Sequence, residues 1–517
     1  MEKRVIIATV LSTLVIIGWT MFFVNKPKPY TVPRQLETTS KSAEIVQKNA
    51  PAVEMNQIDS AKDKDIIIEC ASNKVVFNTL GARIKSWYVK EKNSKQIDLV
   101  LTAPDNGFEA ENFATFNKIN FKIDSKSETG IVFSAVVDNV KVVKTYELSQ
   151  GCLNKVSFQI TNQSNKPRSF PLNMSWGPGI GAAPAEQKQE DALTRVIALA
   201  QISAKASTIQ KLKADTHDAT PYKWVGIDNR YFLIALINEK NLSSIVVNQD
   251  KTSLGKLFTM KAINKLELLP GKTEKLEYSF YIGPKVHSEL KKLGLGLEES
   301  IDFGFFSMLG KGAFFSLKYM YGIVKNYGIA IIILTLIMQV VLFPLTMKSY
   351  QATNGLKLLQ PKMKELQTKF KDEPKRLNAE MMNLYKSHKV NPLGGCLPML
   401  LQIPIFLALY NTLSNTYELR QAPFFLWIND LSAPDLLFSV SGLPIRVLPL
   451  LMGAGMFIQQ KASGASTDPS QKMMVIMMPI IFTFIFYNFA SGLVLYWFVN
   501  SLFTLLGQYV VMKPKKS

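Results

Sequence analysis

The chain has 517 residues, of which 47% are hydrophobic and 19% charged, and its formal net charge is +20. This composition leaves room for membrane spans beside a soluble domain. The positive charge could suggest nucleic acid, but the loop at residues 346–391, between apolar segments, has ten Lys and Arg residues against four acidic ones, and this placement favours a membrane. The sequence has no G-x-x-x-x-G-K-[ST] motif, and its cysteines and histidines lack metal-site spacing, so we expect neither a nucleotide nor a metal or other cofactor.

The N-terminal segment is basic and then apolar. Lys3 and Arg4 precede an apolar run at residues 5–24, close to the length that crosses a bilayer. The run is longer than a signal-peptide core and no A-x-A-like site follows it, so residues 1–24 are predicted to be an uncleaved transmembrane anchor. Residues 25–62 are polar and lack apolar periodicity, which predicts a flexible linker.

The next segment, residues 63–290, consists of short β-branched or alternating runs such as KVVFNTL, KVSFQIT and KLEYSFYIG, separated by turn-type segments. This pattern predicts a largely antiparallel, all-β exported domain, most simply a sandwich. Cys70 and Cys152 lie in it, and we expect free thiols there. The glycine-rich stretch that begins at Trp176 lacks phosphate-loop spacing and is predicted to be a structural loop.

Residues 300–326 combine many aromatic residues with Lys311, Lys318 and Lys325. The segment is too charged to span a membrane and too aromatic to be fully solvated. We therefore predict an interfacial amphipathic segment at the outer membrane surface.

Five further segments approach the length of a membrane crossing. They are residues 327–345, 392–414, 443–460, 473–490 and 492–512. Together with the anchor they predict a polytopic α-helical membrane protein with six transmembrane helices, five of them forming a core at residues 327–512. Arg446 and Pro449 interrupt the fourth of these segments, so five spans is the alternative count.

The loop after residue 345 is rich in Lys and Arg, whereas the loop at 416–442 has only Arg420 against three acidic residues. By the positive-inside rule the first loop is cytoplasmic. Six spans then place the N-terminus and the basic tail at residues 513–517 in the cytoplasm, with the β domain outside.

Apolar residues in this basic loop recur at spacings of three and four on both sides of a KDEP breaker, which predicts a helical hairpin at residues 350–389 with Pro361 in the opening turn of its first helix. The hairpin could simply reinforce topology, or it could dock a ribosome, a nascent chain or a targeting factor. The candidate docking cations are Lys357, Lys362, Lys364, Lys369, Lys371, Lys375 and Arg376.

Polar residues within the apolar segments are the candidate functional site. Thr335 and Gln339 stand four residues apart and share one helix face. An unpartnered amide or hydroxyl costs roughly 2 to 7 kcal/mol in an apolar medium, so this face should contact other helices or a wet cavity. Flexible methionines and other apolar residues could offer a sliding surface to substrates. Its candidates are Met399, Ile403, Phe406, Met473, Met474, Met477 and Met478.

Several stretches from residue 301 to 512 resemble the YidC family of membrane protein insertases. They include LQPKMKEL, VNPLGGCLPMLLQIPIFLALY, YELRQAPFFLWINDLSAPD and SGLVLYWFVN. The exported part resembles the periplasmic β-supersandwich of Gram-negative members through NTLGARIKSW, GPGIG and YIGPK. The resemblance implies a bacterial inner-membrane protein that is not an enzyme, uses no nucleotide, and inserts and helps to fold nascent membrane proteins, alone or with the Sec translocon.

The resemblance also implies a hydrophilic groove open to the cytoplasm and to the lipid. The positions that match the residues lining it in the family are Thr335, Gln339, Gln402, Tyr496 and Trp497. Relatives commonly have Arg where this chain has Gln339, which puts electrostatic capture of acidic substrates by that residue in doubt.

Two other function classes are alternatives to an insertase. A transporter or channel should show repeated halves or intramembrane carboxylates, and residues 327–345, 392–414 and 473–512 contain no Asp or Glu. The third class is a membrane-tethered enzyme or carbohydrate-binding protein whose activity lies in the exported part. An enzyme could use His217 or His287, although no partner residues are visible in the sequence.

Overall fold

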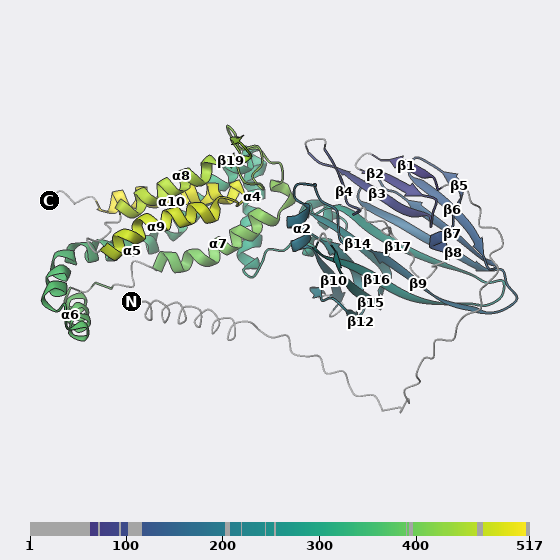
Figure 1. Ribbon diagram of the computed structural model, residues 1–517, viewed down its shortest axis with the longest axis horizontal. Coiled ribbons are helices and arrows are strands. Elements are labelled where there is room, and N and C mark those ends of the chain that lie inside the picture. Colours follow the sequence, from purple (N-terminus) through teal and green to yellow (C-terminus); the bar gives the residue numbers. More distant parts are fainter. Residues whose placement is uncertain are drawn as a thin grey trace, which may run out of the picture. The chain divides into compact units, whose positions relative to one another are not determined.

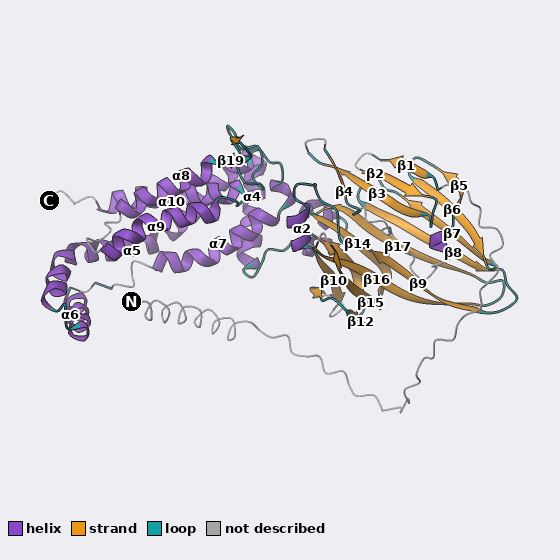
Figure 2. Cartoon of the chain, viewed as in Figure 1, coloured by secondary structure: helices purple, strands orange, loops and turns teal. Residues whose placement is uncertain are grey.

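The computed structural model describes residues 63–512 except 71–72, 93–94, 102–115, 202–206, 219, 243, 253–254, 389, 392–396 and 463–468. The predicted anchor at residues 1–24, the linker at 25–62 and the tail at 513–517 lie outside the described residues. The strands of the described first part of the chain lie between Asp65 and Pro284, and most of the described residues after Pro284 are helical (Figures 1 and 2).

Among the described residues of the first part of the chain, seventeen strands form three sheets, and every pairing with a described register is antiparallel. One four-stranded sheet has the order β1-β2-β3-β4, a nine-stranded sheet β11-β10-β13-β14-β17-β8-β7-β6-β5, and another four-stranded sheet β12-β15-β16-β9. The strands are β1 (Asp65–Glu69), β2 (Asn73–Asn78), β3 (Arg83–Lys90), β4 (Gln96–Asp98), β5 (Lys122–Lys126), β6 (Gly130–Val137), β7 (Val140–Glu147), β8 (Leu153–Asn162), β9 (Arg168–Trp176), β10 (Arg195–Gln201), β11 (Ser207–Leu212), β12 (Thr216–Asp218), β13 (Tyr222–Asp228), β14 (Phe232–Leu242), β15 (Ile245–Thr252), β16 (Gly255–Leu268) and β17 (Thr273–Pro284). The predicted all-β domain is confirmed.

The nine-stranded sheet buries both faces because its central strands are apolar at consecutive positions. On β14, Ile234 joins the core shared with the four-stranded sheets, whereas Leu233 faces a second cluster that contains Leu290, Leu297 and Phe314. Successive strand residues point to opposite faces, so a continuous apolar run can serve two cores. The sheet is therefore packed between other strands on one side and helical segments on the other.

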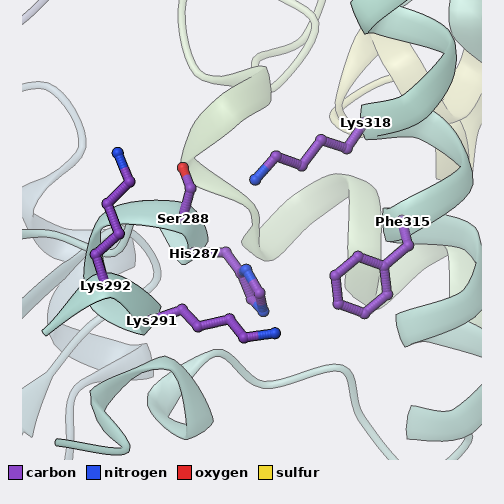
Figure 3. Close-up of a pocket in the computed structure, with 6 residues that line it drawn as sticks. All are labelled: His287, Ser288, Lys291, Lys292, Phe315 and Lys318. Carbon is purple, nitrogen blue, oxygen red and sulfur yellow. The ribbon is translucent and has the colours of Figure 1, made fainter. Parts of the chain in front are cut away.

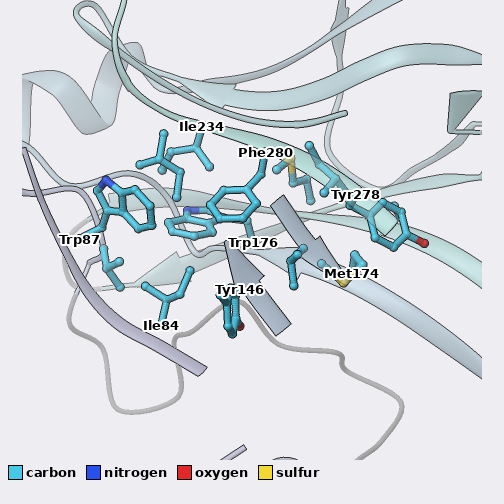
Figure 4. Close-up of a cluster of buried hydrophobic side chains, with 14 of the residues drawn as sticks. Ile84, Trp87, Tyr146, Met174, Trp176, Ile234, Tyr278 and Phe280 are labelled. Carbon is cyan, nitrogen blue, oxygen red and sulfur yellow. The ribbon is translucent and has the colours of Figure 1, made fainter. Parts of the chain in front are cut away.

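Large aromatic side chains hold the sheets together (Figure 4). Trp87 of β3 and Phe280 of β17 pack edge to face with ring centroids 5.9 Å apart, and Trp176 of β9 belongs to the same core. Aromatic pairs add packing energy to a large buried area. In the same part of the chain Cys70 and Cys152 are free thiols, as expected, and burial raises the pKa of Cys152 to about 12.

Helices dominate the second part of the chain, where α10 lies beside α8 and α5 (Figure 1). Small residues permit these approaches: Gly455 of α8 faces Phe498, and Gly507 of α10 faces Tyr350. The described helices are α2 (Gln187–Leu193), α3 (His287–Lys292), α4 (Ser307–Val324), α5 (Tyr327–Lys369), α6 (Pro374–Ser387), α7 (Leu397–Asn415), α8 (Val447–Ala462), α9 (Pro469–Phe486) and α10 (Ser491–Met512), with short 3-10 turns η1 (Phe116–Lys118), η2 (Leu297–Ser300) and η4 (Tyr417–Leu419).

Helix α5 corrects one expectation. The apolar segment at residues 327–345 and the first arm of the hairpin at 350–389 form one continuous helix of 43 residues, with Pro344 and Pro361 both inside it. Pro361 is therefore not in an opening turn. A proline removes one backbone donor, and hydroxyl side chains and neighbouring helices commonly compensate in membrane helices. The carbonyl that loses its backbone donor at Pro344 is that of Val340, four residues earlier in α5.

The fourth predicted span begins later than expected. Residues Leu443–Ile445 form strand β19, which pairs with β18 (Phe438–Val440), and α8 starts only at Val447. The carboxylate of Asp435 accepts hydrogen bonds from the backbone N–H groups of Val447 and Leu448, both at 3.0 Å. This carboxylate caps the helix from a distance in sequence, which the apolar pattern of 443–460 did not reveal.

Among the described helices, α5 alone combines a length of at least 18 residues with the apolarity of a membrane span, and only 28% of its apolar window is buried. Exposed apolar side chains also cover the other helices of this region, including Ile403 of α7, Ile458 of α8 and Phe484 of α9. The six-span count stays a prediction.

A buried charge cluster connects the nine-stranded sheet to the segment before α4. Asp228 of β13 is fully buried and forms ion pairs with Lys285 at 2.9 Å and with Arg195 at 2.8 Å. Arg195 also pairs with Asp302, which accepts from Lys211 at 3.1 Å and from the Gly304 N–H at 2.8 Å. Burial alone would raise the pKa of Asp302, but these partners outweigh it and lower that pKa to about 2.

This cluster predicts a pH dependence of stability. The folded-state pKa of Asp302 lies below its ordinary value of 3.8, so its stabilisation is complete above about pH 4 and is lost as the pH falls towards 2. Asp302→Asn should lower the melting temperature of the full-length protein in detergent by a few degrees at pH 7, and by much less near pH 2.5. Thermal unfolding at both pH values measures this.

Glu277→Gln is the control. The side chains of Lys275 and Glu277 are 62% and 65% exposed, and ion pairs that are this exposed contribute little to the free energy of unfolding. An Asp302→Asn effect that stays equal at both pH values would contradict the proposed role of the carboxylate.

Candidate functional site

Helix α10 carries two polar residues that join it to different neighbours. Tyr496 and Asn500 are four residues apart and therefore share one helix face. The side-chain amide of Gln402 on α7 donates to the Tyr496 hydroxyl, and the amide of Gln339 on α5 donates to the Asn500 side-chain oxygen. Three helices thus meet along one row of polar groups, the α10 polar seam, which comprises Gln339, Gln402, Tyr496 and Asn500.

The members of the seam differ in exposure. Tyr496 is 3% exposed, whereas Gln339, Gln402 and Asn500 are half-buried. Each amide keeps further donor or acceptor capacity after its one interhelical bond. The seam can therefore offer hydrogen bonds to water or to a polar peptide segment at its edge.

Thr335 does not join this seam. Its side chain is 1% exposed, and its hydroxyl donates to the Ile331 carbonyl of its own helix at 2.7 Å. Its neighbours Ile331 and Leu334 belong to the apolar cluster of the helical region. A hydroxyl that is satisfied by the preceding turn needs no outside partner. Sequence spacing put Thr335 and Gln339 on one face, but the packing gives them different surroundings.

Trp497 lies in an aromatic cluster beside the seam. Its ring centroid is 5.1 Å from that of Phe406 on α7, 5.3 Å from that of Phe486 and 5.7 Å from that of Phe482, both on α9. Phe406, predicted as part of a sliding surface, is therefore a packing residue between α7, α9 and α10. Ile403, another predicted member of the sliding surface, is 50% exposed.

Helix α9 presents a continuous apolar stripe. Its members are Met473, Ile476, Met477, Ile480, Ile481 and Phe484, each at least 42% exposed. Their spacing of three and four residues gathers them on one side of the helix. Met473 and Met477 of the predicted slide lie on this stripe and Met478 is half-buried, while the side chains of Met399 and Met474 lie outside the described part.

All seven candidate docking cations of the hairpin are exposed. At the tip, Phe370 is only 8% exposed, and the charged groups of Lys369 and Arg376 lie 5.4 and 5.0 Å from its ring centroid. The Tyr385 hydroxyl lies 3.8 Å from the Met363 sulfur across the two arms. The hairpin thus has a narrow packed seam and a basic outer surface.

The two histidines that a catalytic role would use lie on different elements. His217 is exposed on β12, and His287 packs at the start of α3 against the rings of Phe314 and Phe315. Burial, with the charges of Lys318 and Lys291, lowers the pKa of His287. Among the residues that the structure describes, no group of three or more His, Cys, Asp or Glu side chains could hold a metal ion.

Asn500 is the seam residue that sequence reasoning missed. It ends the stretch SGLVLYWFVN and follows Tyr496 by one helical turn, so the same four-residue spacing that selected Gln339 could have selected it. What the spacing could not give is its partner, because Gln339 lies 161 positions away in sequence.

A large antiparallel β domain and an apolar helical region with a polar seam define a membrane protein with an extramembrane β domain. Two family profiles match: "YidC periplasmic domain" at residues 73–316 and "60Kd inner membrane protein" at residues 319–517. The chain is 41% identical over 525 residues to the membrane protein insertase YidC of Endomicrobium trichonymphae, covering 99% of this chain and 98% of that one. The chain belongs to the YidC family of membrane protein insertases.

A second relative supports the same family. The YidC insertase of Geotalea uraniireducens is 35% identical over 545 residues, and the match covers 100% of this chain and 100% of that one. A crystal structure of an active YidC insertase with its first transmembrane domain resolved is 18% identical, with a TM-score of 0.41, over 88% of this chain and 93% of that one. This protein is thus an inner-membrane insertase with a periplasmic β domain, and membrane proteins are its substrates. Its relatives are named as insertases rather than as enzymes.

The bond between Gln402 and Tyr496 can be measured by a double-mutant cycle. Gln402→Leu, Tyr496→Phe and their combination should give a coupling energy of about 0.6 kcal/mol, the average for interhelical hydrogen bonds in a membrane protein. The free energy of unfolding in mixed micelles supplies the values. Additive effects of the two substitutions would show that the two groups do not interact.

Proposed function

We propose that this protein inserts membrane proteins by leading their hydrophilic segments along the α10 polar seam, within a groove that opens to the cytoplasm and to the lipid. The observation that carries this proposal is that the bonds from Gln402 to Tyr496 and from Gln339 to Asn500 stand one turn apart on one helix. A row of half-buried amides gives a polar segment hydrogen-bond partners inside an apolar region.

The physical problem that the groove solves is desolvation. Each unpaired peptide group or charge costs several kcal/mol in hydrocarbon. A hydrated row of amides shortens the dry part of the path. The substrate's own apolar helix then enters the lipid, which is favourable by roughly 25 cal/mol per Å² of apolar surface. Insertion by this route needs no nucleotide.

The exposed stripe on α9 supports a second part of the proposal. Met473 and Met477, with the isoleucines between and beyond them, would contact the substrate's apolar helix as it leaves the seam for lipid. Unbranched thioether side chains adapt to many partner shapes, which suits a protein that handles many sequences and helps them fold. Ile403 on α7 offers further apolar surface.

The basic hairpin is proposed to face the cytoplasm, together with both chain termini, and to receive the nascent chain from the ribosome, alone or beside the Sec translocon. Support comes from the seven exposed cations and from the continuity of α5. Helix α5 carries both Gln339 and the basic first arm of the hairpin without interruption. A force that a bound partner exerts on this arm would therefore act directly on the helix that contributes Gln339 to the seam.

The first test removes the seam's amides. Gln339→Leu combined with Asn500→Leu should slow the insertion of substrates with hydrophilic tails by roughly fivefold, the rate change expected for one lost hydrogen bond of about 1 kcal/mol. Insertion into proteoliposomes, scored by protease protection of the tail, gives the rate. Thr335→Val is the matched control, because its hydroxyl is satisfied within its own helix. Equal rates for the double variant and the control would exclude the seam from the insertion path.

The second test restores a positive charge. Gln339→Arg should be tolerated, because the Asn500 oxygen can accept from a guanidinium as it does from the amide. Insertion of substrates with acidic tails should become several-fold faster, while substrates with neutral tails should be unaffected. Comparing acidic, neutral and basic tails on one substrate separates charge attraction from a general change. Unchanged or slower insertion of the acidic tail would contradict the prediction.

A further inference from the structure

A pocket of about 470 Å³ lies between α3 and α4, away from the α10 polar seam. Its lining combines cationic and aromatic side chains: His287, Ser288, Lys291, Lys292, Phe315 and Lys318. In Figure 3 the side chains of Lys291 and Lys318 reach towards His287 from the two helices, while Lys292 points away from the ring at the pocket's edge. The volume lies within the range of about 300 to 1,000 Å³ that is typical of small-molecule sites.

The charge of this pocket is poorly compensated. Within the described part of the chain, no carboxylate lies at ion-pair distance from Lys291, Lys292 or Lys318. Of the nearby acidic groups, Glu299 is paired with Lys311 at 3.2 Å. Glu418 accepts from the His287 backbone N–H, also at 3.2 Å, and the charge of Lys318 acts against the rise in the Glu418 pKa that burial causes, so this carboxylate offsets part of the pocket's charge. Three lysines around one opening therefore favour an anion.

The second half of the site is apolar. Phe315 lines the pocket with its ring edge-on to His287, at a centroid distance of 5.3 Å. Beside it on α4, Met308, Tyr319 and Ile323 are 89%, 73% and 67% exposed. The opposite side of α4 is buried through Phe314 and Leu317. An exposed apolar stripe flanked by lysines is the pattern of a helix that lies in a membrane interface.

The position of the helix in the chain identifies the leaflet. Helix α4 follows the β domain, straddles the end of the match to the YidC periplasmic domain at residue 316, and is followed after only two residues by the apolar start of α5. It therefore lies where the chain passes from the periplasm into the bilayer.

We propose that this pocket binds the phosphate headgroup of an anionic phospholipid from the outer leaflet of the inner membrane. Lys291 and Lys318 hold the phosphate, Lys292 adds positive charge at the edge of the pocket, and the acyl chains lie along Phe315, Tyr319 and Ile323. A soluble phosphate would use the lysines but would gain nothing from the apolar stripe. The bound lipid fixes α4 at the membrane surface. Because the nine-stranded sheet packs on Phe314 of α4, the lipid also holds that sheet at the surface.

Lipid binding to the full-length protein tests the proposal. In a neutral detergent, phosphatidylglycerol should bind more tightly than phosphatidylcholine, as counted by native mass spectrometry. A variant with Lys291→Gln, Lys292→Gln and Lys318→Gln should lose at least about tenfold in affinity for phosphatidylglycerol, since each lysine near an anionic lipid contributes roughly fivefold. Lys→Arg at the same three positions should keep the affinity.

The matched control replaces Lys122, Lys126 and Lys272 by Gln, three exposed lysines on β5 and in the turn before β17, and should bind lipid as the parent does. Should the pocket triple variant melt at a lower temperature, Lys318→Gln alone should still lose about fivefold. Equal binding of the two lipids, or equal loss in the control, overturns the proposal. Glycerol phosphate that binds as tightly as the lipid, or an acidic peptide that binds more tightly, would show that the pocket has another occupant.

Discussion

Every polar group placed among the membrane helices of this protein must find a partner, because hydrocarbon supplies none. The structure meets that requirement in two different ways. The Thr335 hydroxyl donates a hydrogen bond to the preceding turn of its own helix, and its side chain is buried between the helices. Gln339 and Gln402 instead bond across helix boundaries to Asn500 and Tyr496. The second solution keeps amide groups near the surface of the bundle, and the proposed insertion route depends on it.

The same reasoning links the helical region to the β domain. Arg420, 5% exposed after α7, pairs with Glu91 at 2.6 Å and with Glu186 at 2.8 Å, both from the β domain. Lys92 donates to the carbonyls of Glu418 and Arg420, each at 2.9 Å. Breaking a buried pair on one side leaves an uncompensated charge, at a cost of about 3 to 5 kcal/mol. These bonds therefore favour a fixed attachment between the two regions.

Apolar exposure separates the roles of the helices. On α9 the stripe from Met473 to Phe484 faces outward along most of the helix, which suits lipid or a substrate helix. On α4 a shorter stripe is bordered by Lys311 and Lys318, which suits the membrane surface. Phe406 and Trp497 are also apolar, but their rings pack in the contacts between α7, α9 and α10. Side-chain type alone does not distinguish these three environments, because each of them favours large apolar residues.

The sequence by itself determined the all-β domain, the apolar helical segments and the basic hairpin, because strand alternation, apolar run length and charge placement are local properties of the chain. It also pointed to Gln339, Gln402 and Tyr496, since amides and hydroxyls are conspicuous in apolar runs. Only the tertiary structure decided that Asn500 completes the seam, that Thr335 stays outside it, and that Asp435 accepts from the first backbone N–H groups of α8. Those outcomes depend on partners distant in sequence or on how a helix is rotated within the bundle, and no local pattern specifies either.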